Sequence, residues 1–128
     1  LELLTCPYVF NEEEARRMAA AGADVLVPHM GLTTSGMIGA HTALTLDDAV
    51  ERVQAIRDAA VAVNPDIFVL CHGGPIAEPD DARHVIANTT GVVGFFGASS
   101  IERLPTERAL TEQVEDFKSI NVVRSISG

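Results

Sequence analysis

Four short apolar segments alternate with four helical patterns along this chain, and this alternation restricts the possible folds more than any other feature. Each apolar segment has the length of a strand and leads through a polar loop into apolar residues spaced three or four apart. Alternation of this kind is typical of right-handed crossovers between parallel strands. We therefore predict an α/β protein of parallel (β/α) units. The predicted strands are residues 1–5, which continue through residues 6–10 into a loop, and residues 24–28, 67–71 and 92–96.

Capping signals mark the starts of the predicted helices. Asn11 precedes three consecutive glutamates, which the positive end of a helix dipole favours in the first turn. Thr45 and Asp48 have the spacing of a capping box. Proline is favoured at the start of a helix, so the last two helices are predicted over residues 80–87, after Pro79, and over residues 105–118. Leu110, Val114 and Phe117 form the apolar stripe of the last helix.

Four units form either a small open sheet or half of a (β/α)8 barrel, since a complete barrel needs about 250 residues. We favour the half-barrel, and the unbroken apolar run at residues 67–71 predicts burial on both faces of its sheet. Two bare strand edges would invite pairing with another copy, so we expect a homo-oligomer. Residues 1–120 are assigned to the partial barrel domain and residues 121–128 to a tail of unassigned role. The chain starts inside an apolar run without an initiator methionine, so we expect it to be part of a longer protein.

The chain is acidic, and its charge limits the partners it can have. A net charge of −9 argues against a nucleic-acid surface, which needs a basic stripe, and against docking on anionic lipid. No apolar run approaches the roughly 20 residues that span a bilayer, and no signal peptide is visible. Cys6 and Cys71 lie in apolar, strand-like contexts where cysteine is usually buried, and they make no disulfide framework. We therefore expect a cytoplasmic protein without nucleic-acid or membrane partners.

The segment after the fourth predicted strand is a candidate anion site. Gly97, Ala98, Ser99 and Ser100 are small residues that let main-chain N–H groups approach a ligand, and the following helix start adds unpaired donors. Ser99 and Glu102 have capping-box spacing, which predicts a short helical turn before the last helix. Phosphate-binding loops with such a turn are common near the last strands of a barrel. The alternative is a plain strand–helix turn.

A second candidate site follows the third predicted strand, where His72 precedes Gly73 and Gly74. If the third and fourth strands are neighbours, the two turns face the same point, which favours a shared phosphate or carboxylate site. His72 can exchange protons near neutral pH or donate to an oxyanion, and its alternative role is to cap the strand end. His29 follows the second strand and is expected to share the site. It opens a long polar loop, residues 29–44, that is predicted to bind ligand or to form a lid.

The remaining polar residues divide into candidates and residues with structural roles. Arg103 is a candidate for bidentate binding of phosphate or carboxylate, and a solvated arginine at a helix end is the alternative. Glu102 is a third candidate catalytic residue, beside His72 and His29, and is alternatively the capping-box partner. His41 is expected in the long loop and His84 on a helix surface. Ser99 and Ser100 lack the nucleophile-elbow pattern, and no Cys/His spacing fits a zinc site.

Runs of residues at the strand ends resemble a known family. They are Pro7–Phe10, Ala21–Asp24, Gly31–Thr34 with Gly39 and Ala40, Cys71–Ile76, and Gly94–Glu107. Together they resemble the TIM-barrel family described as phosphoenolpyruvate hydrolase-like, over nearly all of residues 3–120. The same domain is fused to a second domain in plant and fungal proteins, including a virus resistance protein.

The resemblance implies the C-terminal half of a TIM barrel of the phosphoenolpyruvate/pyruvate-domain type. It also implies Mg²⁺ as cofactor, with carboxylate ligands from an N-terminal half outside this chain. Two functions follow. The first is an enzyme, a hydrolase or lyase, acting on a small phosphorylated or phosphono 2-oxo acid as its anionic substrate. The second is a non-catalytic ligand-binding or protein-interaction barrel.

Overall fold

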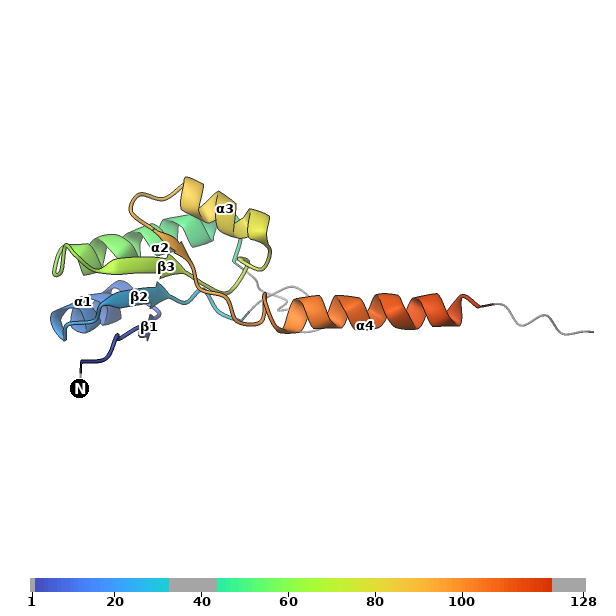
Figure 1. The fold of residues 1–128 in the computed structure, drawn as a ribbon. Coiled ribbons are helices and arrows are strands. Elements are labelled where there is room, and N and C mark those ends of the chain that lie inside the picture. The colour runs from blue at the N-terminus through green and yellow to red at the C-terminus, as the bar shows by residue number, and fades with distance from the viewer. Residues whose placement is uncertain (1, 33–43, 121–128) are drawn as a thin grey trace, which may run out of the picture.

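The computed structural model describes residues 2–32 and 44–120, and its strands form one parallel sheet in the order β1-β2-β3-β4 (Figure 1). The predicted α/β class is therefore confirmed. Strands and helices alternate as β1 Tyr8–Val9, α1 Glu12–Ala20, β2 Val25–Pro28, α2 Leu46–Val61, β3 Phe68–Cys71, α3 Pro79–Ala87, β4 Gly94–Phe95 and α4 Arg103–Lys118. His41, most of the loop at residues 29–44 and the tail at residues 121–128 lie outside the described residues.

Consecutive strands of the chain are neighbours in the sheet. Leu26 aligns with Val69, and Cys71 aligns with Phe95, in parallel register. Each crossover therefore places the next strand beside the previous one, as along one side of a (β/α)8 barrel. The arrangement is consistent with a partial barrel of this type.

The first strand begins later than the sequence indicates. Residues 1–5 were predicted to form it, but β1 is Tyr8–Val9, and the side chains of Leu3 and Leu4 are exposed. Thr5 is tied instead to the residue before β2, because its N–H and hydroxyl both donate to Asp24 Oδ2, at 2.9 and 2.8 Å. Cys6 is exposed, which corrects its predicted burial, whereas Cys71 is buried as predicted.

Helices cover one face of this sheet. Val9, Leu26, Val69 and Cys71 are fully buried in one cluster with residues of the helices, namely Ala15 and Ala19 of α1 and Ala49, Val53, Ile56 and Ala60 of α2. Burying a valine or leucine side chain contributes about 1.5–3 kcal/mol. The alanines keep α1 thin, which lets α1 and α2 pack beside each other on the sheet.

The opposite face of the sheet is only partly covered in the described residues, since Val27 is fully buried there but other positions are exposed. Phe68 aligns with Val25 and is 60% exposed, although Val69, the next residue, is fully buried. Burial of residues 67–71 on both faces was therefore a wrong prediction for this chain. The reason is that α1 and α2 cover a single face.

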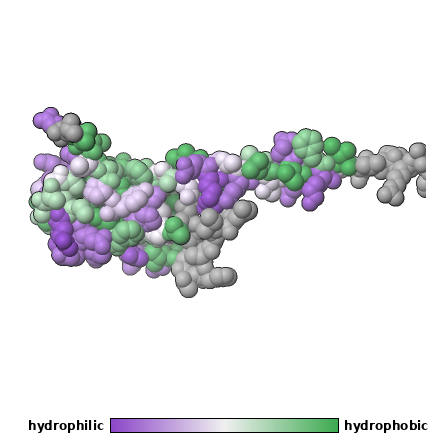
Figure 2. Space-filling model, turned by 90° about the horizontal axis from the view of Figure 1, so that it is seen from below, coloured by the Kyte–Doolittle hydropathy of each residue, from purple (hydrophilic) through white to green (hydrophobic). Residues whose placement is uncertain are grey.

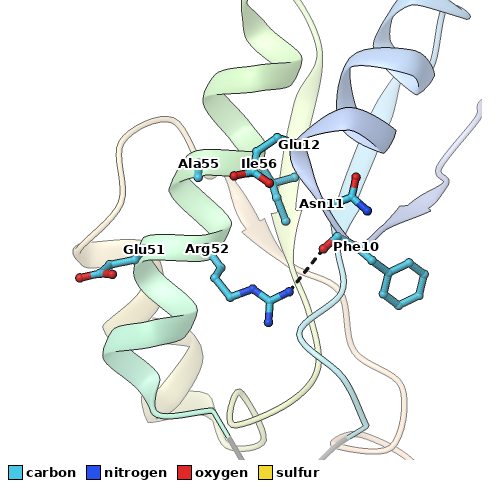
Figure 3. Close-up of a pocket in the computed structure, with 7 residues that line it drawn as sticks. All are labelled: Phe10, Asn11, Glu12, Glu51, Arg52, Ala55 and Ile56. Carbon is cyan, nitrogen blue, oxygen red and sulfur yellow. Dashed lines mark hydrogen bonds between the residues drawn. The ribbon is translucent and has the colours of Figure 1, made fainter.

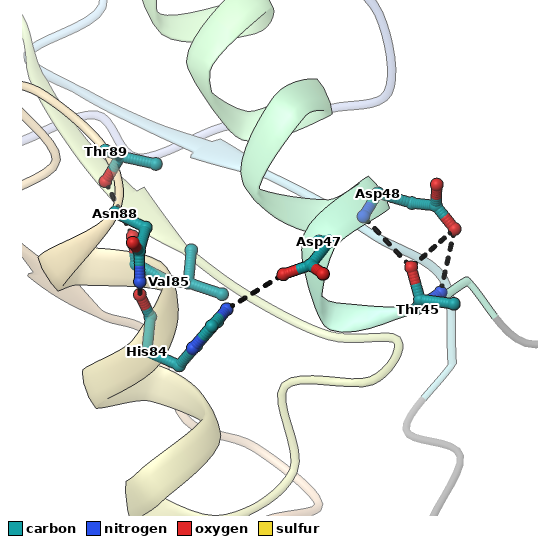
Figure 4. A network of polar contacts seen from close by, with 7 residues as sticks. All are labelled: Thr45, Asp47, Asp48, His84, Val85, Asn88 and Thr89. Carbon is teal, nitrogen blue, oxygen red and sulfur yellow. Dashed lines mark hydrogen bonds and ion pairs between the residues drawn. The ribbon is translucent and has the colours of Figure 1, made fainter.

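The predicted caps of α1 and α2 are present, whereas the capping box predicted for Ser99 and Glu102 is not found at the start of α4. Asn11 Oδ1 accepts from the Glu14 N–H at 2.9 Å, and Thr45 and Asp48 form a complete capping box at the start of α2 (Figure 4). In the same first turn of α2, Asp47 Oδ1 lies 3.1 Å from His84 Nε2 and links α2 to α3 (Figure 4). Local capping therefore sets the helix starts, and one side-chain contact ties two neighbouring units together.

The last helix departs from the body of the molecule (Figure 1). It begins at Arg103 rather than at Pro105, and Leu104 is its one buried residue. Leu110, Val114 and Phe117 are 63%, 54% and 65% exposed, so the predicted apolar stripe exists but does not pack on this chain. Figure 2 shows apolar and polar residues mixed along this projecting helix. In the described part of the chain, no helix is long and apolar enough to cross a membrane.

A close main-chain contact joins the ends of β2 and β3. Gly74 has a φ of +60°, and a Cβ atom there would lie 2.4 Å from the Met30 carbonyl oxygen. Gly22 also has a positive φ, of +91°, but a Cβ atom there would meet nothing within 4 Å. The two glycines therefore separate the effect of backbone conformation from the effect of crowding.

Gly74→Ala is expected to lower the free energy of unfolding by at least about 2–3 kcal/mol, because the strained φ and the clash with main chain add together. Gly22→Ala, the matched control, is expected to cost only about 1 kcal/mol, for the strained φ alone. Urea denaturation of both variants measures the difference. Equal losses would contradict the close approach of residues 30 and 74.

Candidate functional site

Aromatic and imidazole rings from all four strands meet at the carboxyl end of the sheet. We call Tyr8, His29, His72 and Phe96 the ring cluster. The Tyr8 and His72 rings are stacked, with centroids 5.0 Å apart and an interplanar angle of 6°. The His29 ring is edge-on to His72 at 4.7 Å, and Phe96 is edge-on to His72 at 5.7 Å. Parallel pairing explains why these four rings lie together, because it places the ends of all four strands at one edge of the sheet.

The His72 ring is held by a main-chain carbonyl. His72 Nδ1 lies 2.7 Å from the Phe96 oxygen, and the residue is 7% exposed. A carbonyl can only accept, so Nδ1 carries the proton and donates it. In the neutral ring, Nε2 then keeps its lone pair. His72 is therefore oriented as a base.

The His29 ring has the opposite polarity. The Gly31 N–H donates to His29 Nδ1 at 3.0 Å, so Nδ1 is the acceptor and Nε2 carries the proton of the neutral ring. Burial lowers the pKa of His29 below its ordinary value, and the neighbouring His72 lowers this pKa further. His29 is thus a neutral hydrogen-bond donor beside a base.

The ring cluster does not by itself fit a Mg²⁺ ion. Magnesium prefers oxygen ligands, and the cluster has no carboxylate. Among the described residues, no group of three or more His, Cys, Asp and Glu side chains could hold a metal ion. The Nε2 of His29 also carries a proton, which leaves no lone pair for a metal there.

The two predicted turns lie at the ends of neighbouring strands, since β3 pairs with β4 and Phe96 N–H donates to the Cys71 oxygen at 2.9 Å. The first turn is shaped largely by packing. Gly74 N–H donates to the Gly31 oxygen at 2.8 Å, and a Cβ atom at Gly73 would lie 2.5 Å from the same oxygen. Gly73 and Gly74 therefore have a steric role beside the anion-binding role predicted for them, and the latter stays a prediction.

The second turn is helical. The Ile101 N–H donates to the Ala98 oxygen and the Arg103 N–H donates to the Ser99 oxygen, at 2.9 and 3.0 Å. The N–H groups of residues 98–100 come before the first of these bonds, so the turn does not use them. Residues 98–100 come just after Gly97 in the sequence. They are therefore close in sequence to Phe96, whose carbonyl accepts the hydrogen bond from His72. Binding of an anion by these donors stays a prediction.

Glu102 and Arg103 lie at the start of α4. Glu102 is exposed and is the N-cap residue. Arg103 Nη1 lies 2.8 Å from Glu107 Oε1, with each side chain 20% exposed. The charge of Arg103 is thus partly balanced within the helix, and a phosphate role for Arg103 or a catalytic role for Glu102 stays a prediction.

Sequence reasoning did not identify Tyr8 and Phe96 as site residues. Phe96 could have been found from its place at the carboxyl end of the predicted strand 92–96, whereas Tyr8 lay in a predicted loop and gave no such signal. Cys71 is not a candidate nucleophile, since burial raises the pKa of its thiol to about 11.

A separate hollow of about 300 Å³ lies between the start of α1 and the middle of α2 (Figure 3). Arg52 Nη2 lies 3.4 Å from the Phe10 oxygen across it, and the Phe10 ring in turn contacts His29 at 5.1 Å. The lining charges, Glu12, Glu51 and Arg52, are of mixed sign and favour no single class of ligand.

Fold and site together define a parallel α/β protein with its candidate site at the carboxyl ends of the strands. The family described as phosphoenolpyruvate hydrolase-like matches residues 1–120, and the chain belongs to this family. The resemblance in the sequence is thereby confirmed.

Curated relatives are much longer than this chain. Two proteins of Solanum lycopersicum, named ToMV susceptible protein tm-1(GCR26) and ToMV resistance protein Tm-1(GCR237), are 59% and 58% identical over 120 residues. Each comparison covers 94% of this chain and 16% of the relative. A protein of Sinorhizobium fredii, whose name proposes a transcriptional regulatory role, is 31% identical over 122 residues, covering 95% of this chain and 20% of that protein.

The lowered pKa of His29 predicts a pH dependence of stability. The unfolded chain binds a proton near pH 6.5, and the folded chain binds it only at lower pH, so folding stability falls as the pH drops below about 6.5. In His29→Asn, Oδ1 can accept from Gly31 in place of Nδ1 without titrating. We expect this variant to lose less stability between about pH 7 and 5.5 in urea denaturation. An equal loss in both proteins would contradict the lowered pKa.

Proposed function

We propose that the chain is part of an enzyme, a hydrolase or lyase, that acts on a small phosphorylated or phosphono 2-oxo acid. The observation that carries this proposal is the polarity of the two imidazoles. His72 presents Nε2 as a base, and His29 presents Nε2–H as a donor, in rings 4.7 Å apart. Family membership supports the substrate class.

For hydrolysis of phosphoenolpyruvate, the residues would act in sequence. The N–H groups of Gly97 to Ser100 would hold the phosphate, with Gly73, Gly74 and Arg103 as further contacts. His72 Nε2 would accept a proton from the attacking water as the bond between phosphorus and the enol oxygen breaks. His29 Nε2–H would stabilise the enolate oxygen, and the proton would return to the enolate carbon to give pyruvate and inorganic phosphate. Mg²⁺ stays the expected cofactor, with ligands outside the described residues, and Glu102 a candidate catalytic residue.

A non-catalytic barrel that binds a ligand or a protein is the second candidate. The names of the two tomato relatives favour it, because they describe susceptibility and resistance to ToMV rather than a reaction. The two candidates differ in turnover, so an experiment that measures both binding and turnover can separate them.

We expect phosphoenolpyruvate and inorganic phosphate to shift the main-chain amide resonances of residues 97–100. We further expect His72→Asn to lower the rate of phosphate release at least about 100-fold without loss of binding, since its amide can still donate to the Phe96 carbonyl but cannot act as a base. His84→Asn, in a residue of α3 that contacts Asp47 and not the ring cluster, is the matched control and should keep full activity.

Each outcome decides between the candidates. Binding without turnover in the unchanged protein would favour the binding module. Amides of residues 97–100 that neither ligand moves would contradict both the enzyme and the anion site.

We also propose a cytoplasmic location and a homo-oligomer. Cys6 and Cys71 are free thiols, which suits a reducing compartment.

The exposed stripe of Leu110, Val114 and Phe117 on α4 supports association with a second copy.

Replacing Leu110, Val114 and Phe117 by serine is therefore expected to convert the oligomer to a monomer in sedimentation velocity experiments. Glu112→Ser, on the opposite side of α4, is the control and should keep the oligomer. A monomeric unchanged protein at tens of micromolar would contradict the proposal.

A further inference from the structure

The ring cluster contains one residue whose position has no explanation in the proposed chemistry. Tyr8 comes from β1, whose register aligns it with Val27 of β2, two residues before His29. Its ring reaches both imidazoles, with centroids 5.0 Å from His72 and 4.9 Å from His29. Tyr8 is 41% exposed, and its ring stacks on that of His72, which is 7% exposed.

The hydrogen bond to Phe96 fixes only one atom of the His72 ring. An imidazole with one hydrogen bond can still tilt by rotation about its Cβ–Cγ bond, and such a tilt would weaken the hydrogen bond and redirect Nε2. The Tyr8 ring lies nearly parallel to the imidazole, at 6°, and the edge of Phe96 meets it at 85°. Contact with a flat face removes the tilt that a single hydrogen bond allows.

We propose that Tyr8 is a positioning residue, which holds the His72 imidazole so that Nδ1–H donates to the Phe96 carbonyl and Nε2 stays the acceptor. The aromatic face of Tyr8 does this, so phenylalanine should replace it. The functional meaning of the position rests on the proposed role of His72 as a base. The position itself can be measured without any substrate.

The chain offers a matched control for Tyr8. Phe10 is two residues away and also has an aromatic ring against the cluster, in contact with His29 at 5.1 Å. No contact between Phe10 and His72 is found among the described residues. Loss of the Phe10 ring therefore tests whether any aromatic ring at this edge has the same effect.

The experiment measures the ¹⁵N resonances of the His72 ring nitrogens, which report the tautomer, in the full chain and its variants. The unchanged protein and Tyr8→Phe should both hold the Nδ1–H tautomer. Tyr8→Leu should lower the ratio of the two tautomers up to about tenfold, toward that of a free imidazole. Tyr8→Met, an unbranched side chain that adapts to irregular space, replaces Tyr8→Leu if the latter does not fold. Phe10→Leu should leave the His72 tautomer unchanged.

Kinetics with phosphoenolpyruvate add a second readout. Tyr8→Leu should lower kcat about 10- to 100-fold with little change in KM, and Tyr8→Phe should restore it. An unchanged His72 tautomer in Tyr8→Leu, or an equal change in Phe10→Leu, would overturn the proposal. A shifted tautomer in a chain that never turns over phosphoenolpyruvate would instead refute the proposed function and leave the role of Tyr8 standing.

Discussion

The main-chain pairing of β3 with both of its neighbours is the constraint on which the candidate site depends. On one side, the Met30 N–H donates to the His72 oxygen, and on the other the Phe96 N–H donates to the Cys71 oxygen, both at 2.9 Å. These bonds bring three strand ends, distant in sequence, into one row. Because every strand runs the same way, the side chains that follow the strands share one edge of the sheet. The histidines meet there as a result of topology, before any side-chain contact is considered.

The sequence predicts well what is decided locally and less well what depends on pairing. The cap at Asn11 and the capping box of Thr45 and Asp48 use residues three positions apart, and both are confirmed. The first strand was placed too early because residues 1–5, three of them leucine, have a pattern like that of a buried strand. Because of that error Tyr8 was placed in a predicted loop, so its ring contact with His72 could not be predicted. Register between strands depends on residues far apart, which a single sequence does not reveal.

The same division holds for the site. Positions directly after strands identified His29 and His72, but their opposite hydrogen-bonding roles depend on the Gly31 N–H and the Phe96 carbonyl, which only the folded chain brings close. The glycines at positions 73 and 74 were interpreted as anion donors, and the structure adds a steric reason for them in the nearby main chain of residues 30 and 31. A glycine that permits a close approach looks the same in sequence whether a ligand or another loop approaches.

The fourth unit contributes a strand to the sheet but lends almost none of its helix to the core, since Leu104 alone is buried in α4. The packing of the core therefore depends little on the residues of α4 that follow Leu104. Substitutions beyond Leu104 are therefore expected to disturb the packing of the sheet little. Among the described residues, the helix that projects from the body is thus also a place where new associations can evolve at little cost to folding.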